Sequence, residues 1–296
     1  MPTQQQLFPD EVARFKSLYK ASGLTPDVVV AFQDIIKRHY SNRGRKFPFR
    51  EPSHYNDPYK VLVSEIMLQQ TQTDRVVDKY LAFISAFPDF NALAAAPSDA
   101  VLKAWVGLGY NRRALALKRT AEEVVSKHGG KLPSSVDELD DFPSIGPNTA
   151  ASIATFAYNL PVPFIETNVR AVYTHFFFDD DPATTDAAIL GIVERTIDKK
   201  NPREWYYALM DYGILLKKAG KDPARLNAGK SKAAPFKGSD RQVRGKILKS
   251  LLSSPKKIDV IAKDIGEAEE RVARLAARLE KEGFLARTGS RLCIKK

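Results

Sequence analysis

Two segments of the sequence carry residues that could act together on a nucleotide. Residues 139–150 (LDDFPSIGPNTA) have the form of a hairpin between two helices, and Glu166 follows 18 residues after Asn148. The tight turn ends at Gly146, and the next helix begins at Pro147, Asn148 and Thr149. Backbone N–H groups at a helix start point outward and favour an anion such as a phosphate. A phosphate-binding helix start followed by a carboxylate predicts an enzyme that acts on a nucleotide of DNA.

Composition sets limits on the class of protein. The 296 residues are 44% hydrophobic and 27% charged, which predicts a globular chain with more than one domain. The net charge of +11 favours a polyanionic partner, with nucleic acid first and an anionic membrane surface second. The single cysteine, Cys293, excludes an intramolecular disulfide and a cysteine-based zinc or iron–sulfur site.

The sequence shows neither a signal peptide at residues 1–6 nor an apolar run near the ~20 residues of a membrane span. We therefore expect a cytoplasmic protein without a membrane partner, associated with the nucleoid if its source is bacterial or archaeal. We also expect a monomer.

Helical spacing of apolar residues dominates the first part of the chain, and alternating β-branched runs are scarce. A helix is predicted after Asp57-Pro58, with Val61, Leu62, Ile66 and Met67 on its apolar face. Further helices are predicted over residues 76–84, 100–105, 114–127, 149–158, 186–199 and 203–217. Residues 218–239 are rich in Lys, Gly, Ala and Pro, which indicates a basic linker, either a solvated spacer or a phosphate contact.

Residues 240–296 form a second pattern. Three helices are predicted over 241–252, 258–265 and 267–282, followed by two strands around a glycine turn. This arrangement resembles a winged helix-turn-helix, whose third helix would enter the major groove of DNA. Here that helix carries both glutamates and arginines. The C-terminal residues could therefore contact DNA or form a protein-docking module.

Residues 31–217 resemble the helix-hairpin-helix DNA glycosylase superfamily, and within it the MutY-type adenine glycosylases. The resemblance rests on Phe47-Pro-Phe-Arg50, Asp57 to Thr73, Trp105 to Ala114, the hairpin at 139–150, Glu166-Thr-Asn-Val-Arg170 and Met210-Asp211-Tyr-Gly213. The string from Ser64 to Gln72 (SEIMLQQTQ) points to the adenine branch. The resemblance implies a mainly α fold: an N-terminal extension (1–30), a two-lobed helix-hairpin-helix glycosylase domain with a cleft (31–217), the basic linker (218–239) and a small winged-helix-like C-terminal domain (240–296).

Two carboxylates are the catalytic candidates. Glu65 lies on an otherwise apolar helix, so burial should raise its pKa and suit it to general acid catalysis. In the resembled enzymes the matching Glu protonates the departing adenine; a surface ion pair is the alternative. Glu166 stands where the family carries a catalytic Asp that stabilises an oxocarbenium-like sugar, and a plain helix-start carboxylate is the alternative. Asn168 is expected to support Glu166 or to contact the sugar–phosphate.

Two hairpin residues depart from the family pattern. Asn148 stands where bifunctional relatives carry a catalytic Lys, so strand cleavage through a Schiff base is not expected and the enzyme should be monofunctional. Ser144 replaces the usual first Gly of the hairpin, so its turn should avoid a positive φ or bear strain. Ser144, Gly146, Asn148 and Thr149 remain the expected phosphate contacts.

Other residues are expected to face the DNA. Gln69, Gln70 and Gln72 follow Glu65. In relatives such a Gln wedges into the duplex where the base leaves. An ordinary exposed polar loop is the alternative interpretation of these glutamines. Tyr110 resembles a residue near the wedge, and a core position is equally compatible. Arg50 resembles a base-pocket residue, with a simple ion pair as the alternative.

Two features of relatives are missing. Lys217 and its neighbours replace the four-cysteine iron–sulfur segment, so no cofactor or metal is expected. The 57 residues after 239 are too few for the Nudix-like domain that reads oxidised guanine. The sequence thus predicts a monofunctional glycosylase acting on double-stranded DNA with a mismatched or damaged base, adenine opposite guanine or 8-oxoguanine first. A thymine or uracil glycosylase, another damaged-base glycosylase and a non-catalytic DNA-structure-binding protein are the alternatives.

Overall fold

The computed structural model describes residues 8–221 and 237–295, and helices account for most of them. The chain forms two compact units. The first comprises the described residues within Met1–Val61, Ser134–Asp141 and Ile145–Ser231, and the second comprises those within Leu62–Pro133, Phe142–Ser144 and Lys232–Lys296. Helix α4 (Pro58–Leu68) passes from the first unit into the second.

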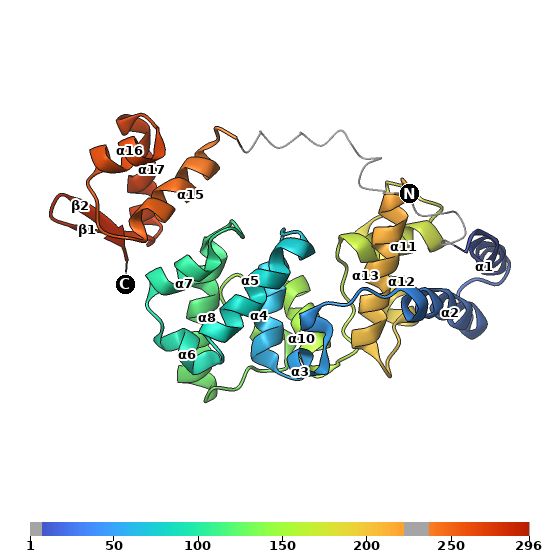
Figure 1. Ribbon diagram of the computed structural model, residues 1–296. Helices are drawn as coiled ribbons and strands as arrows, with labels where there is room; N and C mark the ends of the chain where they lie inside the picture. The colour runs from blue at the N-terminus through green and yellow to red at the C-terminus, as the bar shows by residue number, and fades with distance from the viewer. Residues whose placement is uncertain (1–7, 222–236, 296) are drawn as a thin grey trace. The chain divides into compact units, whose positions relative to one another are not determined.

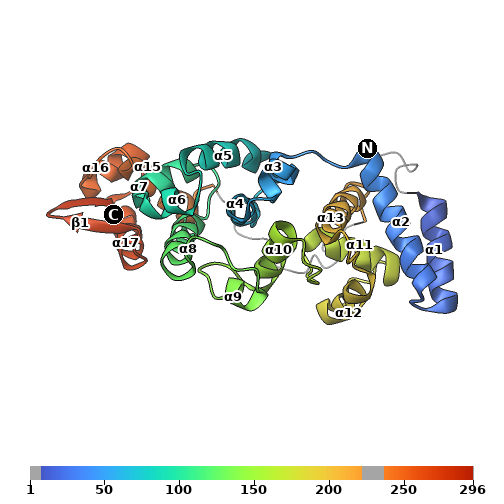
Figure 2. The ribbon, with the colours of Figure 1, turned by 90° about the horizontal axis from the view of Figure 1, so that it is seen from below.

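The first unit is a helical bundle. Its elements are α1 (Pro9–Ser22), α2 (Pro26–Arg43), the 3-10 turn η2 (Pro48–Arg50), α3 (Pro52–Tyr55), α9 (Val136–Asp140), α10 (Pro147–Tyr158), α11 (Thr167–Phe177), α12 (Asp186–Thr196) and α13 (Pro202–Lys218). Helix α11 packs along α13, and α2 and α1 lie against them (Figures 1 and 2). An aromatic cluster fills the interface, where the Phe32 ring lies 4.9–5.5 Å from those of Tyr173, Phe176, Phe177 and Trp205.

The segment expected to be an N-terminal extension belongs to this core. Phe15 of α1 is buried, and its ring lies 5.8 Å from Phe32 and 5.4 Å from Phe176. Helix α2 runs without a break across the predicted boundary between residues 30 and 31. Helix α2 packs against both α1 and α13, so the described residues before position 31 pack onto the same core as the helices that follow.

The second unit begins with the C-terminal part of α4 and continues through α5 (Thr73–Ala86), α6 (Phe90–Ala95), α7 (Ser98–Trp105) and α8 (Arg112–His128). Helix α8 packs against α6 and α7, with Phe83 of α5 and Trp105 of α7 fully buried in edge-to-face contact at 5.9 Å. Helix α6 was not predicted, because it spans only 6 residues and starts from an Asp89 cap.

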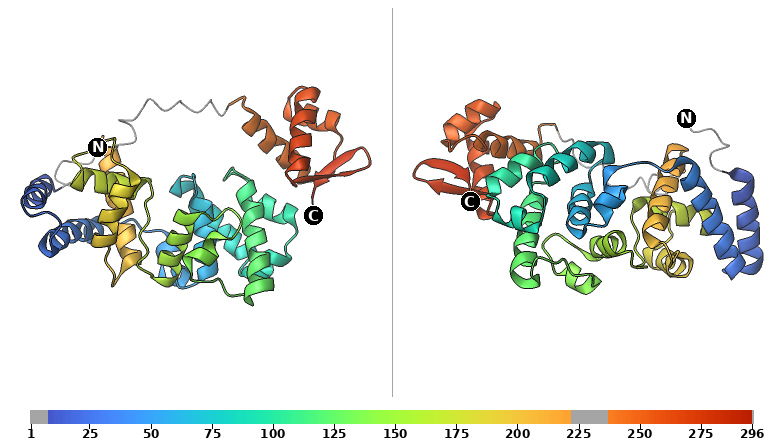
Figure 3. Two further views of the ribbon diagram at one scale, coloured as in Figure 1. Left: turned by 180° about the vertical axis from the view of Figure 1, so that it is seen from behind. Right: turned by 60° about the horizontal axis from the view of Figure 1, so that its bottom comes forward.

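The same unit contains the C-terminal helices α15 (Asp240–Leu251), α16 (Ile258–Ile265) and α17 (Glu269–Lys281), which contact one another. They precede the antiparallel hairpin β1 (Leu285–Thr288) and β2 (Arg291–Ile294), drawn in red in Figure 3. Lys256 adds a short bridge to Leu292, so a third short segment extends the hairpin. Three helices with a small sheet have the order of a winged helix. Across residues 8–221 and 237–295, no helix combines the length and apolar character needed to cross a membrane.

Candidate functional site

Glu65 lies on a helix that is buried on most sides. Val61, Leu62, Ile66 and Met67 of α4 are each at most 3% exposed, as the apolar spacing predicted, and Glu65 itself is half-buried. A carboxyl in this place is partly removed from water. Its role as the general acid remains a prediction.

Arg113 holds the end of the Glu65 helix. Its side chain is buried and donates to the carbonyl oxygens of Ile66 at 2.8 Å, Met67 at 3.1 Å and Gln69, and to Oγ1 of Thr71 at 3.0 Å. These carbonyls are the ones that a helix end leaves without partners. Burial lowers the pKa of Arg113. The sequence alone does not identify Arg113 as part of the site, because nothing in its local pattern shows that its side chain contacts α4.

The predicted wedge residues lie on the loop that Arg113 fixes. Gln69 donates from Nε2 to the carbonyl oxygen of Ser144 at 3.2 Å, which ties this loop to the hairpin turn. Gln70 is exposed with a φ of 53°, and Gln72 is exposed just before α5. Tyr110 is 53% exposed with a φ of 47°, so it does not occupy a core position. Gln70, Gln72 and Tyr110 are thus exposed to solvent, and DNA contacts of the wedge residues and Tyr110 remain predictions.

The hairpin turn carries backbone strain at Ser144. Its φ is 64°, in the left-handed region, so of the two outcomes expected for this residue the turn bears the strain. Gly146 has a φ of −112° and a ψ of 174°, which any residue can adopt. The position that benefits from glycine is therefore 144.

Replacing Ser144 by Gly should stabilise the protein by about 0.5–1 kcal/mol, because the left-handed conformation costs an L-residue roughly 1–2 kcal/mol and glycine returns part of that as chain entropy. Urea unfolding measures the change. Ser135→Gly is the matched control, since Ser135 has a φ of −70° and makes no side-chain cap. Equal effects of the two substitutions would contradict the strain at Ser144.

Glu166 is the N-cap of α11. Its Oε1 accepts hydrogen bonds from the backbone N–H groups of Asn168 at 2.9 Å and Val169 at 3.1 Å, and its Oε2 accepts one from Nδ2 of Asn168 at 3.1 Å. The extra methylene of Glu lets the carboxylate fold back onto the helix start. The carboxylate is therefore held in one orientation, and Asn168 supports Glu166 directly.

Asn148 holds the segment that leads into Glu166. Its Nδ2 donates to the carbonyl oxygen of Ile165 at 3.2 Å, from the first turn of α10. The chain therefore uses the amide at this position to fix the loop beside the N-cap. Gly146 and Thr149 lie at the same helix start, and phosphate binding there remains a prediction.

Arg50 belongs to a buried ion cluster on Asp211 of α13. The Arg50 guanidinium donates to both carboxylate oxygens of Asp211 at 3.0 and 3.1 Å, and Arg45 donates from Nε at 2.8 Å and from its backbone N at 2.7 Å. The Asp211 side chain is 2% exposed and that of Arg50 is 6% exposed. The ion-pair alternative for Arg50 is thus present in the structure, and a role in binding a base remains a prediction.

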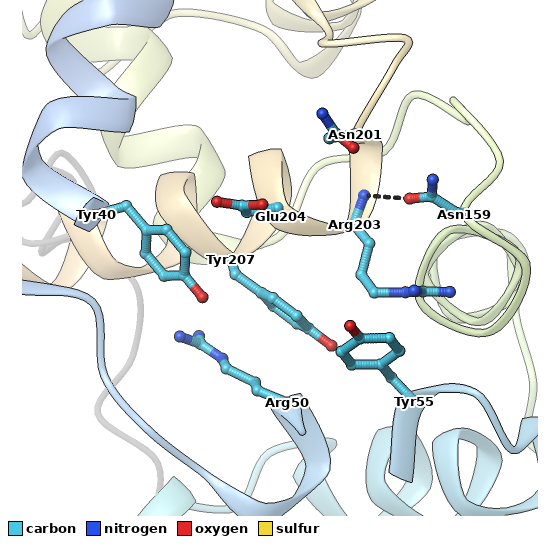
Figure 4. A pocket seen from close by; sticks show the side chains of 8 residues that line it. All are labelled: Tyr40, Arg50, Tyr55, Asn159, Asn201, Arg203, Glu204 and Tyr207. Atoms are coloured by element: carbon cyan, nitrogen blue, oxygen red, sulfur yellow. Dashed lines mark hydrogen bonds between the residues drawn. The ribbon is translucent and has the colours of Figure 1, made fainter. Parts of the chain in front are cut away.

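Arg50 also lines a pocket of about 320 Å³ in the first unit (Figure 4). The pocket wall consists of Tyr40, Arg50, Tyr55, Asn159, Asn201, Arg203, Glu204 and Tyr207. The Arg50 guanidinium lies 4.6 Å from the ring centre of Tyr207, and that of Arg203 lies 4.2 Å from the ring centre of Tyr55. Arg203 donates to the carbonyl oxygens of Phe156 and Ala157 at the end of α10. Arg203 therefore joins α13 to the end of α10 at the wall of this pocket.

The C-terminal helices carry much of the positive charge. Residues 237–295 contain 15 Lys and Arg against 8 Asp and Glu. Part of this charge is paired within the domain, in the ion pairs Arg244–Glu282, Arg271–Asp240, Arg271–Glu267, Arg274–Asp240 and Arg287–Glu280. Arg278, Lys281, Arg291 and Lys295 make no ion pair with any residue that the structure describes. Of these four, Arg278 and Lys281 lie in the second half of α17, Arg291 lies in β2 and Lys295 follows β2 directly, while Lys249 of α15 and Lys263 of α16 are likewise without an ion pair among the described residues.

The residues present do not fit an iron–sulfur cluster. Cys293 is the single cysteine of the sequence and lies in β2, so four thiolate ligands are not available. In the described ranges, no group of three or more His, Cys, Asp or Glu could hold a metal ion.

Comparison with known proteins adds to this geometry. A model of the HhH-GPD superfamily of base excision DNA repair proteins matches residues 63–195. A curated adenine DNA glycosylase of Mycolicibacterium smegmatis is 34% identical over 231 residues, which cover 73% of this chain and 78% of that protein. The human adenine DNA glycosylase is 30% identical over 194 residues, 62% of this chain and 36% of that protein. The solved structure of a thermostable thymine-DNA glycosylase shares the fold, with a TM-score of 0.54 and 22% identity over 70% of this chain and 88% of its own.

Proposed function

Because this chain belongs to the helix-hairpin-helix superfamily of base excision DNA repair proteins, in its adenine DNA glycosylase branch, we propose that it is a monofunctional adenine DNA glycosylase. Its substrate is double-stranded DNA with adenine opposite guanine or 8-oxoguanine. The observation that carries the proposal is the match of 34% identity across 78% of a curated adenine DNA glycosylase.

Each carboxylate has one task in the proposed reaction. Glu65 donates a proton to the departing adenine, and its half-buried place on α4 suits a carboxyl that must be protonated to act. Glu166, held by three hydrogen bonds at the start of α11, stabilises the positive charge that develops on the sugar. Water then completes the hydrolysis of the N-glycosidic bond.

The product is an abasic site with an intact strand. Position 148 carries an amide in place of an amine, and that amide donates to the Ile165 carbonyl. An amide cannot form a Schiff base with the sugar, so no strand cleavage follows from this position.

The test is a panel of duplexes that present adenine opposite guanine or 8-oxoguanine, thymine or uracil opposite guanine, and hypoxanthine. Abasic sites are detected by alkaline cleavage, and cleavage without alkali reports lyase activity. Release of adenine alone supports the proposal. Release of thymine, uracil or hypoxanthine instead of adenine would show a glycosylase with a different base specificity. Tight binding without release of any base would support a non-catalytic DNA-structure-binding protein.

We also propose that the C-terminal domain adds phosphate contacts through the unpaired cations of α17 and β2. Reversing two of them, with Arg278→Glu and Lys281→Glu, should reduce the slope of log Kd against log salt by about 2, since each phosphate contact contributes roughly 0.9 to the slope. Fluorescence anisotropy with a duplex measures the slope. Lys249→Glu with Lys263→Glu is the control, because these exposed lysines lie on α15 and α16. An equal loss in both pairs would show a general charge effect, and no loss in either would favour a protein-docking module.

A further inference from the structure

Lys217 of α13 reaches the residue that supports Glu166. Its Nζ donates to Oδ1 of Asn168 over 2.8 Å. Lys217 follows Gly213 by four residues and so lies on the same face of α13. At Gly213 a Cβ atom would lie 2.6 Å from the Cβ of Asn168, which is closer than real Cβ atoms come. Glycine at 213 therefore lets α13 approach the start of α11 closely enough for the lysine contact.

The contact with Lys217 decides which way the Asn168 amide points. An ammonium group has three donors and no acceptor, so the amide oxygen must face Lys217. The amide nitrogen is then turned toward Glu166, where it donates to Oε2 at 3.1 Å. A flipped amide would place its NH₂ against the ammonium and an oxygen against the carboxylate, losing both hydrogen bonds. The positive charge also polarises the amide and strengthens its N–H donor.

We propose that Lys217 is a positioning residue for Glu166, acting through the amide of Asn168. This inference rests on the proposed function, in which the Glu166 carboxylate stabilises the sugar cation. The backbone N–H groups of Asn168 and Val169 fix Oε1 of the carboxylate, and the Lys217–Asn168 pair fixes Oε2. Both oxygens are then set before the DNA arrives.

Three variants test the role of Lys217 in single-turnover base release at saturating enzyme. Lys217→Met should lower the rate constant by about 10- to 100-fold, because small misplacement of a catalytic group has effects of this size. Lys217→Arg keeps the charge and the donors, so it should recover most of the rate. Lys218→Met is the matched control, since Lys218 is the exposed neighbour at the end of α13.

Duplex binding, measured by anisotropy, separates positioning from phosphate contact. The two Met variants should have the same Kd within about twofold, as each removes one positive charge. In an Asn168→Ala background, Lys217→Met should cause no further loss of rate, because the two residues act as one unit. A weaker Kd with an unchanged rate, or equal losses of rate in both backgrounds, would overturn the proposal.

A readout without DNA distinguishes this inference from the proposed function. The side-chain NH₂ resonances of Asn168, identified by their loss in Asn168→Ala, should shift in Lys217→Met and stay in place in Lys218→Met. If the wild type releases no base, the glycosylase proposal fails. The Asn168 resonances then show, without any activity measurement, whether Lys217 orients the Asn168 amide. If the wild type releases adenine and Lys217→Met equals Lys218→Met in rate, the positioning role is overturned and the glycosylase stands.

Discussion

Glu65→Gln will reduce release of adenine by at least about 100-fold, because general acid catalysis contributes roughly 10²- to 10⁴-fold and glutamine has no proton to give. Glutamine has the same shape as glutamate and can occupy the same half-buried place on α4. The expected loss is therefore in the chemical step. Single-turnover kinetics at saturating enzyme measure it directly, and the Kd for the same duplex should change by less than about threefold, since one neutralised carboxylate has only a small effect on phosphate binding.

The control for Glu65→Gln is Glu194→Gln, which makes the same substitution at an exposed position of α12. It should leave the rate unchanged. Glu65→Asp keeps the acid but withdraws it by roughly one methylene, so it should retain part of the activity. A Glu65→Gln variant that releases adenine at the wild-type rate would exclude Glu65 as the acid and would place the protonation elsewhere.

The helices that carry Glu65 and follow the hairpin could be predicted because a proline after a turn marks the start of each and residues of high helix propensity follow, although both helices are buried on most sides. Helix α4 was expected after Asp57-Pro58 and begins at Pro58, and α10 was expected over 149–158 and spans Pro147–Tyr158. Helix α11, which positions Glu166, was not predicted. Its residues from Val169 to Phe177 are buried on nearly every side, so no polar face marks the period, and β-branched and aromatic residues dominate it.

Only those residues of the candidate site that belong to a local sequence motif could be predicted. Glu65, Glu166 and Asn168 are predicted from local motifs, and the structure places a hydrogen bond from Asn168 to Glu166, while their catalytic roles remain predictions. The partners that fix these groups come from elsewhere in the chain. Arg113 is 46 and 47 residues from the carbonyls of Met67 and Ile66, and Lys217 is 49 residues from Asn168. Such contacts depend on how helices pack, which a local pattern does not contain.

Glu166→Gln will lower the rate of base release by at least about 100-fold, since removing one preorganised electrostatic group from an active site costs roughly 10²- to 10³-fold. Glutamine retains one oxygen that can accept from the backbone N–H groups of Asn168 and Val169, so the cap of α11 survives, while its NH₂ cannot accept from Nδ2 of Asn168 and that hydrogen bond is lost. The free energy of unfolding should accordingly fall by less than about 1 kcal/mol, whereas Glu166→Ala removes the cap and should cost about 1 kcal/mol. The two variants thereby distinguish the catalytic role of the Glu166 charge from its role as the helix cap.

Glu166→Asp asks whether the longer side chain is required. Aspartate is a favoured N-cap residue, so the helix start should remain intact. Its carboxylate would lie closer to the backbone, beyond easy reach of Nδ2 of Asn168, which now donates to Oε2 of Glu166 at 3.1 Å. We therefore expect a loss of roughly 10-fold, between those of the wild type and Glu166→Gln, in line with a displacement of about an ångström. A Glu166→Gln variant with wild-type rate would leave Glu166 as a helix cap alone, because the charge that must stabilise the sugar cation would have been removed without effect.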